Sequence, residues 1–551
     1  MSSVYPWSYY ITSGSIAPTF LCGIALIKNA RAIVSCDLED RVYYNCDLLI
    51  EDNKIAKIGT GIEDTEAQCI RAEGKYVYPG LVNMHHHFFQ AFVRNVMSID
   101  RPGLTLMQWL DAIYKVFASV NGDVIYFASL ACMADLIKHG CTCSLDHQYC
   151  YTQLTGKETI DRQMEAADLM GFRFIAARGT NTLPRSKGST IPDEMCETTT
   201  DYIKDCERLI EKYHDPNPFA MHQIVLAPCQ PVNCEEETFL ETIRLARQAG
   251  VYMHTHLCEG ENRDMLDRFG MRSLAWCEKV GFVGSDIWVA HGRETLPEEY
   301  NFMAKHGMGI SHCPAPTIYG GSEILDIPGM TKAGIPISLG VDGCSTNEGS
   351  NMLDSIRLAY LMQAFLSKQR RACPTPYDIM KISTAAGAKM MGRPELGQLA
   401  VGKAADLFLI DIEKLEYAGA LHDAKSLIPK LGTTGNVWLT MINGKIVFQN
   451  GKLERDLSRG ISPYTNEIDT PYSYGILYYD KKAIFPFSFH TRGKYCFRFI
   501  WRAFLTALLS GLDLRFYICR YSSFKAVPIS LFILLHLCSC FTAADWAVYP
   551  E

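Results

Sequence analysis

The sequence lacks several features that would assign the protein to a special class. It has no excess of basic residues, since 53 Lys and Arg stand against 60 Asp and Glu, for a net charge of −7 and a pI near 6.1. Nucleic acid is therefore not expected as a partner. No Lys or Arg precedes Lys28, and the early apolar run at residues 19–27 is too short and wrongly flanked for a secretory signal.

The cysteines lack the pattern of a disulfide-stabilised protein. There are 21 of them, an odd number, spread over 551 residues without dense regular spacing and without a C-x-x-C pair. We therefore expect free thiols in a reducing compartment, which indicates a cytoplasmic protein. A hydrophobic fraction of 48%, a charged fraction of 21% and a mean hydropathy of −0.01 are typical of a globular chain with a sizeable core.

A long uncharged run is found at the C-terminus. Residues 526–544 carry no formal charge, a length close to a membrane span, and basic residues precede them between positions 515 and 525. One hypothesis is a C-terminal membrane anchor. The other, which we favour because Pro528 and His536 interrupt the run, is an appendage or a translated non-coding extension. Membrane contact is expected only under the first hypothesis.

Between Val77 and Asp342 the chain alternates short apolar, β-branched runs with longer stretches of helical spacing. Eight strands alternating with helices over this length are typical of a TIM-type (β/α)8 barrel. The sequence therefore predicts an α/β protein built on such a barrel. The eight predicted strands are residues 77–84, 142–145, 172–177, 223–227, 251–253, 287–290, 308–311 and 335–341.

The segments on both sides of the barrel show strand-like alternation, at residues 21–72 before it and at residues 406–410 and 437–448 after it. We expect the two flanks to pair into one small β-sandwich domain. The predicted boundaries are 1–20 for a leader, 21–76 and 396–453 for the two parts of the β-sandwich, 77–395 for the barrel, 454–489 for an extended arm and 490–551 for a hydrophobic tail.

Ligand-type side chains follow several of the predicted strands. His85 and His87 end the first strand, and because side chains two apart in a strand share a face, both can bind one metal while His86 points away. His256 follows the fifth strand and Asp342 the eighth. Since the C-terminal strand ends form the active-site face of such a barrel, these side chains are expected to meet in one mouth.

Three neutral imidazoles and one carboxylate suit Zn²⁺, with Fe²⁺ as the alternative. Such a metal lowers the pKa of its water toward neutrality, and Asp342 can take the proton. Glu259, three residues after His256, is placed to act as a general acid or base, and His291 ends the sixth strand. Because no Lys ends the fourth strand to bridge two ions, we expect one metal.

Together these motifs resemble the amidohydrolase superfamily, in its branch of aminohydrolases and chlorohydrolases that act on nucleobases and triazines. The similarity covers roughly residues 21–453. Within the branch, Asp146-His147-x-Tyr149 and residues 226–229 and 342–352 are most similar to 8-oxoguanine deaminases and their pterin-deaminating relatives. The motifs that carry the resemblance are Pro79-Gly80-Leu81-Val82-Asn83-x-His85-x-His87-x-x-Gln90, His256-x-x-Glu259, His291, Gly340-Val341-Asp342-Gly343 and residues 396–407.

The resemblance implies roles for these residues. Glu259 would protonate the ring nitrogen beside the attacked carbon, and His291 would orient the hydroxide or polarise the tetrahedral centre. Gln90 would hydrogen-bond an amide edge of the substrate. The implied metal ligands are His85, His87, His256 and Asp342.

Three further residues are candidates for substrate contact. Trp109 and Tyr149 could stack on a flat heterocycle, although packing in the core is at least an equal alternative for each aromatic. Arg178, after the third predicted strand, either binds an oxo group or braces the barrel. The loop at residues 315–320 departs from the polar sequence usual in the relatives, which leaves the substrate open.

Attack on an amidine-like carbon needs an activated water, a proton for the ring and a proton for departing ammonia. We therefore expect a metal-dependent deaminase of a purine or pterin heterocycle such as 8-oxoguanine or guanine. One alternative is the same site with another leaving group, namely a triazine chloride or alkylamine, or a cyclic amide. Another is a non-catalytic scaffold barrel, which the complete ligand set argues against. A small heterocycle is the expected partner, and a homo-oligomer is the expected assembly.

Overall fold

The structure is a computed structural model that describes residues 23–95, 104, 106–367, 372–432 and 435–454. The chain divides into two compact units, Met1–Gly460 and Ile461–Glu551. In the second unit the description covers β18 (Tyr478–Tyr479) and β19 (Lys482–Ala483), which pair antiparallel. The expected leader, most of the expected arm and the hydrophobic tail therefore lie outside the described residues.

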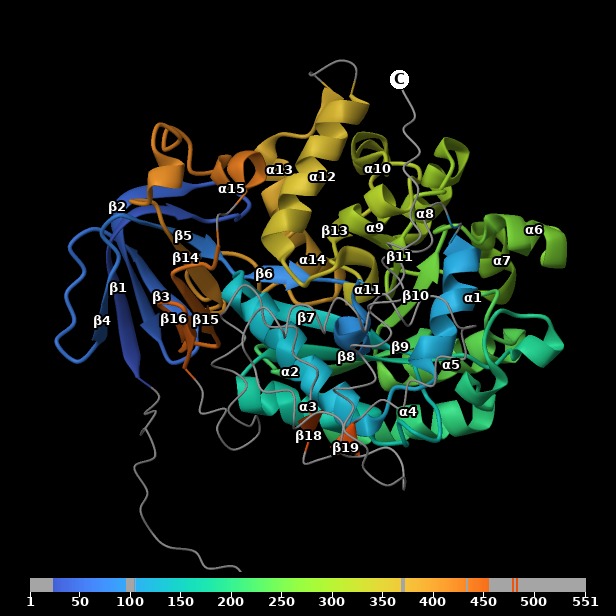
Figure 1. Cartoon of the computed structure of the whole chain (residues 1–551). Helices are drawn as coiled ribbons and strands as arrows, with labels where there is room; N and C mark the ends of the chain where they lie inside the picture. The colour runs from blue at the N-terminus through green and yellow to red at the C-terminus, as the bar shows by residue number, and fades with distance from the viewer. Residues whose placement is uncertain are drawn as a thin grey trace, which may run out of the picture. The chain divides into compact units, whose positions relative to one another are not determined.

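Eight parallel strands form a barrel in which each strand pairs with the next one along the chain (Figure 1). Backbone hydrogen bonds from Met84 N to Leu339 O and from Asp342 N to His85 O join the last strand to the first. The predicted (β/α)8 barrel is confirmed. The strands are β6 (Leu81–Asn83), β7 (Cys141–Gln148), β8 (Arg173–Thr180), β9 (His222–Pro228), β10 (Met253–Leu257), β11 (Ile287–His291), β12 (Gly309–His312) and β13 (Ile337–Leu339).

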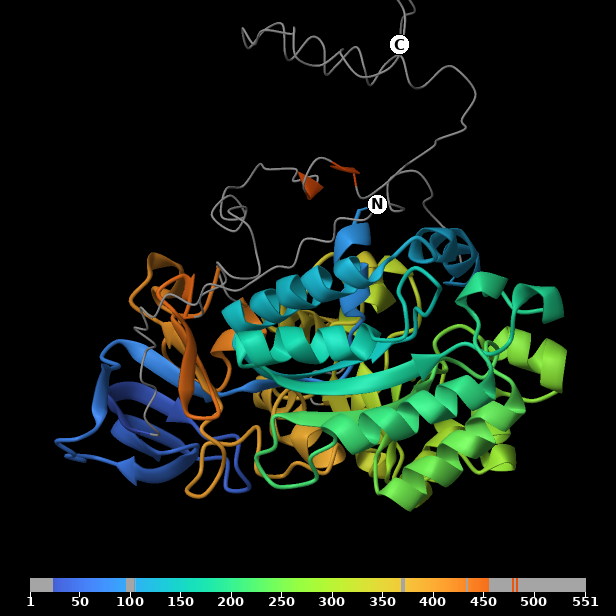
Figure 2. The same ribbon diagram turned by 90° about the horizontal axis from the view of Figure 1, so that it is seen from below.

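Helices follow the strands and surround them (Figures 1 and 2). Side-chain caps begin some of them: Thr198 Oγ1 accepts from Asp201 N at α4, and Thr375 forms a capping box with Asp378 at α13. The helices are η1 (Phe88–Val93), α1 (Leu106–Phe117), α2 (Gly122–Lys138), α3 (Thr159–Met170), α4 (Thr199–Tyr213), α5 (Glu236–Ala249), α6 (Asn262–Phe269), α7 (Ser273–Val280), α8 (Tyr300–His306), α9 (Pro314–Tyr319), α10 (Ile327–Ala333), α11 (Cys344–Asn347), α12 (Met352–Leu366), α13 (Pro376–Ile382), α14 (Ala385–Met390) and α15 (Leu427–Leu431).

A mixed sheet of nine strands lies beside the barrel, and both flanks of the chain contribute to it (Figure 1). The antiparallel pairing of β5 with β14 joins the flanks, and one buried cluster takes Ile33 and Leu48 from the first flank and Leu407 and Leu439 from the second. The expected small β domain is confirmed. Its strands are β1 (Ile24–Val34), β2 (Val42–Glu51), β3 (Lys54–Gly59), β4 (Gln68–Arg71), β5 (Lys75–Pro79), β14 (Leu407–Asp411), β15 (Leu439–Ile442), β16 (Lys445–Gln449) and β17 (Lys452–Leu453).

The first predicted strand, residues 77–84, is divided in the structure at Gly80. Its beginning belongs to β5 in the small domain and its end to β6 in the barrel. A side chain at Gly80 would collide with that of Thr142, and the Gly80 amide donates to Asp406 O at 2.9 Å. One apolar run thus serves two sheets, and its hydrophobicity alone does not mark the division.

The fifth predicted strand, residues 251–253, is displaced. β10 begins at Met253 and includes His254, Thr255 and His256, all of which are buried. The apolar pattern ends early because the inner face of this strand carries imidazoles instead of aliphatic side chains.

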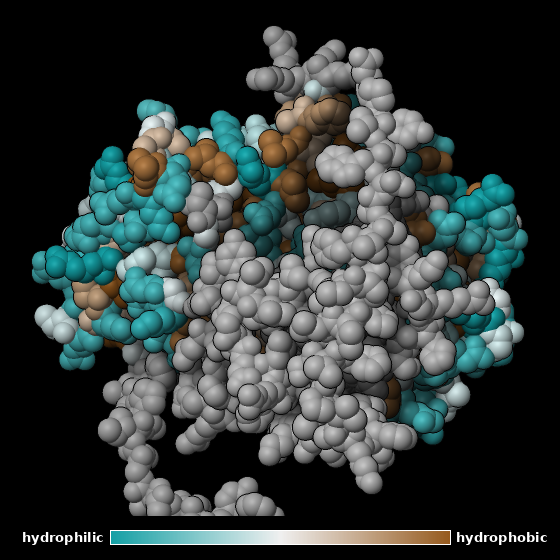
Figure 3. All heavy atoms as spheres, viewed as in Figure 1, coloured by the Kyte–Doolittle hydropathy of each residue, from teal (hydrophilic) through white to brown (hydrophobic). Residues whose placement is uncertain are grey.

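Large hydrophobic side chains are exposed on α12, where Figure 3 shows hydrophobic surface near the top of the view. They are Leu361, Phe365 and Leu366, and Phe365 is 85% exposed. Such surface is typical of an interface, but the homo-oligomer stays a prediction. Among the described residues no single helix is long and apolar enough to cross a membrane; the bent pair α1 and α2, at 117°, meets the length and composition criteria together.

The joint between barrel and small domain contains a buried ion pair. Arg173 at the start of β8 donates from Nε and Nη2 to Asp406 at 2.9 and 3.0 Å, and both residues are at most 1% exposed. Asp406 also accepts from Asn443 N at 2.7 Å, while Arg173 Nη1 donates to two carbonyls. Removing one member would leave the other charge buried without its partner.

We expect Asp406→Asn to lower the free energy of unfolding by about 3 kcal/mol or more, because broken buried pairs cost this much. Urea denaturation of the full chain measures the loss. The control is Asp267→Asn, which breaks the exposed pair of Asp267 with Arg263 on α6 and should cost under about 1 kcal/mol. Equal midpoints for the two variants would contradict the role given to Asp406.

Candidate active site

The C-terminal ends of the barrel strands bring the predicted site residues together. His85 and His87 follow β6, His256 lies in β10, His291 ends β11 and Asp342 follows β13. All five are buried, at 6% exposure or less, in the same mouth of the barrel. Buried groups of this kind that could hold a metal include His85, His87 and Asp342 as one set and His85, His256 and His291 as another.

Hydrogen bonds fix the proton on two of these imidazoles. His87 Nδ1 lies 2.8 Å from His147 O, and His256 Nδ1 lies 2.9 Å from Cys229 O. Because a carbonyl only accepts, each Nδ1 carries the hydrogen. Burial lowers the pKa of His256 well below its usual value, so this ring is neutral and its Nε2 bears a lone pair.

A chain of three groups fixes the tautomer of the third imidazole, that of His85. His254 Nδ1 lies 2.9 Å from Trp288 O and therefore donates, which makes His254 Nε2 an acceptor. His85 Nδ1, 2.9 Å from that Nε2, must then be the donor. Burial lowers the pKa of His85 to about 4, so its Nε2 is also an unprotonated acceptor.

The acceptor atoms face one another at short range. His87 Nε2 lies 3.0 Å from His256 Nε2, and Asp342 Oδ1 lies 3.3 Å from the Nε2 atoms of both His85 and His87. His85 Nε2 has no hydrogen-bond partner within the described part of the chain. Three lone pairs and a carboxylate repel one another at these distances, and a divalent cation between them removes the repulsion. The donor set is therefore one that fits a metal ion.

Glu259 and His291 form a second group at the rim of this cluster. Glu259 Oε1 lies 3.4 Å from His291 Nε2, and Gln230 Nε2 donates to Glu259 Oε2 at 3.3 Å. Burial raises the pKa of Glu259 to about 8, although the nearby Arg293 lowers it. The carboxyl is therefore largely protonated at neutral pH, and Gln230 donates to its Oε2 while its Oε1 lies toward His291.

The backbone is left-handed at both His291 and Asp342, with φ of 71° and 65°. In β11 the side chain of Trp288 packs on the inner His254, so strict alternation would direct His291 outward. The positive φ ends the alternation and allows the His291 ring to stack on His256 with centroids 5.6 Å apart. Strain of this kind at non-glycine residues is typical of functional sites.

The expected substrate-contact residues divide into two groups. Tyr149 lies edge-on to His87 at 4.9 Å, and Gln90 Oε1 accepts from Ser345 Oγ at 2.6 Å, next to Gly343 and Asp342. Trp109 is half-buried on α1, edge-on to Phe117 at 6.5 Å. Tyr149 and Gln90 thus adjoin the ligand cluster, whereas Trp109 lies farther out.

Two carboxylates bind the guanidinium of Arg178. Its guanidinium donates to Glu197 at 2.7 and 2.8 Å and to Asp205 at 2.8 Å, and it lies over the Tyr151 ring at 3.6 Å. A guanidinium with its charge already neutralised has little left to offer a substrate. The structure therefore favours the second alternative for Arg178, a brace for the barrel.

Sequence reasoning missed Gln230 and Arg293 and left His147 without a role. His147 stacks on His256 with centroids 4.8 Å apart and donates from Nε2 to Ala227 O at 2.8 Å. Each of these residues lies at or just past a strand end, which is the positional signal that could have found them.

A neighbouring cluster of His86, Cys132 and Cys344 offers metal-type atoms as well. His86 Nδ1, however, accepts from His87 N at 2.7 Å, so Nε2 carries the hydrogen and donates to Ser350 Oγ at 2.8 Å. This imidazole has no free lone pair for a metal. The same hydrogen-bond logic that supports the first cluster therefore argues against this one.

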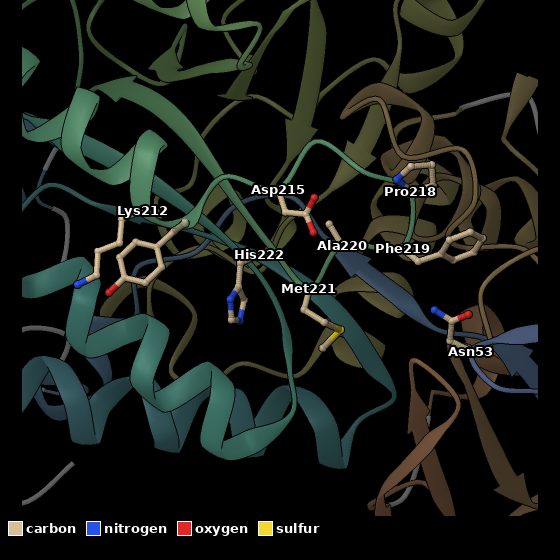
Figure 4. A pocket seen from close by; sticks show the side chains of 9 residues that line it. Asn53, Lys212, Asp215, Pro218, Phe219, Ala220, Met221 and His222 are labelled. Carbon is tan, nitrogen blue, oxygen red and sulfur yellow. The ribbon is translucent and has the colours of Figure 1, made fainter. Parts of the chain in front are cut away.

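A separate pocket of about 390 Å³ opens at the N-terminal end of β9, at the opposite end of the barrel strands (Figure 4). Its lining includes Asn53, Lys212, Asp215, Phe219 and His222, with none of the predicted site residues. The acceptor cluster described above therefore lies at the other end of the barrel strands.

The geometry of the mouth agrees with comparisons to known proteins. The sequence profile of the amidohydrolase family matches residues 76–447. The chain belongs to the amidohydrolase family. It is a hydrolase that acts on carbon–nitrogen bonds, and the family and reaction class predicted from the sequence are confirmed.

Relatives of this amidohydrolase are named for different heterocyclic substrates. Hydroxydechloroatrazine ethylaminohydrolase of Pseudomonas sp. (strain ADP) is 47% identical over 449 residues, 79% of this chain and 93% of the relative. The 8-oxoguanine deaminase of Pseudomonas aeruginosa is 33% identical over 387 residues, 69% and 85% of the two chains. Atrazine chlorohydrolase from Arthrobacter aurescens, solved with zinc, superposes with a TM-score of 0.75 at 28% identity, covering 79% of this chain and 98% of that one.

We expect His254→Phe to weaken zinc binding by this amidohydrolase about 10- to 100-fold, because His85 loses the acceptor that fixes its tautomer. Competition with a chromophoric chelator measures the affinity. The control is His222→Phe, at the opposite end of the barrel, which should bind zinc as the native chain does. Native zinc affinity in His254→Phe would contradict the tautomer argument.

Proposed function

We propose that the protein is a zinc-dependent hydrolase that replaces an amine substituent on a ring carbon of a nitrogen heterocycle with oxygen and releases the amine. The observation that carries this proposal is the protonated carboxyl of Glu259, 3.4 Å from His291 at the rim of the acceptor cluster. An amine leaves a tetrahedral carbon readily only after it gains a proton, whereas chloride needs none. A buried acid poised near neutral pH is therefore suited to amine departure.

One zinc ion would be held by Asp342 Oδ1 and the Nε2 atoms of His85, His87 and His256, and when bound it supplies a water acidified toward neutral pH. Asp342 would take the proton that the attacking water loses. Thr346 Oγ1 donates to Asp342 Oδ2 at 3.0 Å and keeps this carboxylate in place.

Glu259 would deliver its proton to the ring nitrogen beside the attacked carbon. The ionised carboxylate would then take the proton of the hydroxyl that has added to that carbon and pass it to the leaving amine, and the proton held by Asp342 would restore the acid. Gln230 orients this carboxyl by donating to its Oε2. His291, packed on His256, would polarise the oxygen that adds to the ring carbon. Tyr149 and the Gln90 amide would position the flat ring.

Two leaving groups are candidates. Release of an alkylamine from a hydroxylated triazine is supported by the ethylaminohydrolase relative at 47% identity over 93% of its length. Release of ammonia from a purine or pterin, the reaction expected from the sequence, is supported by the 8-oxoguanine deaminase relative at 33%. Both reactions use the same acid and the same acceptor cluster.

Product analysis distinguishes the two. We expect the full chain with one equivalent of zinc to release ethylamine from hydroxydechloroatrazine faster than it releases ammonia from 8-oxoguanine, guanine or isoxanthopterin. Chromatography of derivatised amines measures both products. Asp342→Asn should abolish release, since a ligand and the proton acceptor are lost together. Absence of any amine from the whole panel would overturn the proposed function.

The protonated state of Glu259 predicts a pH dependence. The acid form is lost as pH rises through about 8, so kcat/KM should fall on this alkaline side. Glu259→Gln should keep its zinc, lose activity by a factor on the order of 100 and lose this limb of the profile. Loss of zinc in Glu259→Gln would show that the carboxyl is a ligand rather than an acid.

A further inference from the structure

Four arginines of the described chain are buried, and three of them are neutralised by carboxylates. Arg173 pairs with Asp406 at 2.9 Å, Arg178 with Glu197 at 2.7 Å, and Arg393 with Glu395 at 2.6 Å. This is the usual condition of a buried guanidinium, because an unpaired charge in a protein interior is costly.

Arg293, two residues after His291, is the exception. Arg293 is 7% exposed. Among the described residues, the carboxylate oxygen paired with it is Glu259 Oε1, which lies 4.0 Å from Arg293 Nη2 and so beyond hydrogen-bond distance. Arg293 Nη1 has no hydrogen-bond partner among the described residues.

The guanidinium is held in place despite this missing partner. Arg293 Nε donates to the backbone oxygen of Glu259 at 2.6 Å. This hydrogen bond holds the guanidinium beside the Glu259 carboxyl. A rigid cation with an orphaned buried donor, next to the group that protonates the ring, is arranged to receive an acceptor that the protein does not provide.

We propose that Arg293 binds an oxo or oxyanion substituent of the heterocyclic substrate, so that the enzyme selects amino heterocycles that also carry a ring oxygen. This inference rests on the proposed function and deepens it, because it names the substrate class. The substituent would accept hydrogen bonds from the buried guanidinium while the ring nitrogen faces Glu259. A ring with hydrogen in place of that oxygen would leave the guanidinium unpaired.

The native full chain, loaded with zinc, gives the first test. Hydroxydechloroatrazine is compared with the same triazine bearing hydrogen in place of its hydroxyl, by amine release and by the KM of each ring. We expect kcat/KM to be higher for the oxygenated ring by about 100-fold or more, since sites built around a hydrogen bond reject analogues that lack it.

Variants of Arg293 test whether this residue causes the preference for the oxygenated ring. Arg293→Gln should lower kcat/KM for the oxygenated ring by about 100-fold and for the hydrogen analogue by less than about 5-fold, with Arg293→Lys between. Arg293→Ala should regain part of its activity on the oxygenated ring when guanidinium is added. The matched control, Arg263→Gln on α6, removes an 83% exposed guanidinium side chain and should change neither rate. Thermal unfolding and zinc content verify that each variant folds and is loaded.

The alternative roles of Arg293 predict different results. If it only tunes or positions Glu259, Arg293→Gln will lower both rates by the same factor and shift the alkaline limb of the pH profile. Equal losses on the two rings would overturn the inference while leaving amine release, and so the proposed function, intact. Failure of the native chain to release amine from either ring and from 8-oxoguanine, guanine and isoxanthopterin would instead overturn the proposed function.

Discussion

The rest of the site depends on the close approach of four acceptor atoms at the mouth of the barrel. Three imidazole nitrogens and one carboxylate oxygen each lie 3.0 to 3.3 Å from at least one other of the four, which is repulsive unless a cation lies among them. The surrounding backbone prevents any of these imidazoles from escaping the repulsion by changing tautomer. Carbonyls of His147 and Cys229 hold two of the rings, and His254 with the Trp288 carbonyl holds the third. The register of β7, β9, β10 and β11 therefore determines the chemistry of the cluster.

The groups in and around this cluster differ in their protonation states. The imidazole of His85 is neutral because burial opposes its positive charge, and Glu259 is protonated because burial opposes its negative charge. One desolvated environment thus produces both the metal-binding bases and the proton donor. Arg293 lies in the same region, and the substrate supplies the hydrogen-bond acceptor that its guanidinium lacks in our account. The left-handed backbone at His291 and Asp342 is strained, and this conformation allows both side chains to point inward.

Much of this arrangement could be predicted from the sequence, and the failures have physical causes. His85, His87, His256 and Asp342 were recognisable because each follows or ends a predicted strand and all are strong ligand types. The division at Gly80 was not, since a continuous apolar run contains no sign that two sheets share it. Arg178 could not be assigned, because its partners Glu197 and Asp205 lie in a distant loop and helix. Arg293 escaped attention because its distinguishing feature, the lack of a close carboxylate, exists only in three dimensions.

Anomalous scattering at the zinc edge from crystals of the zinc-loaded full chain tests the central claim most directly. The account predicts one strong peak, bound by Asp342 Oδ1 and the Nε2 atoms of His85, His87 and His256 at about 2.0 to 2.2 Å. His254 should lie behind His85 without touching the ion. A peak bound instead by His86, Cys132 and Cys344, or a structure in which the three imidazoles remain at their present separations with no ion, would contradict it.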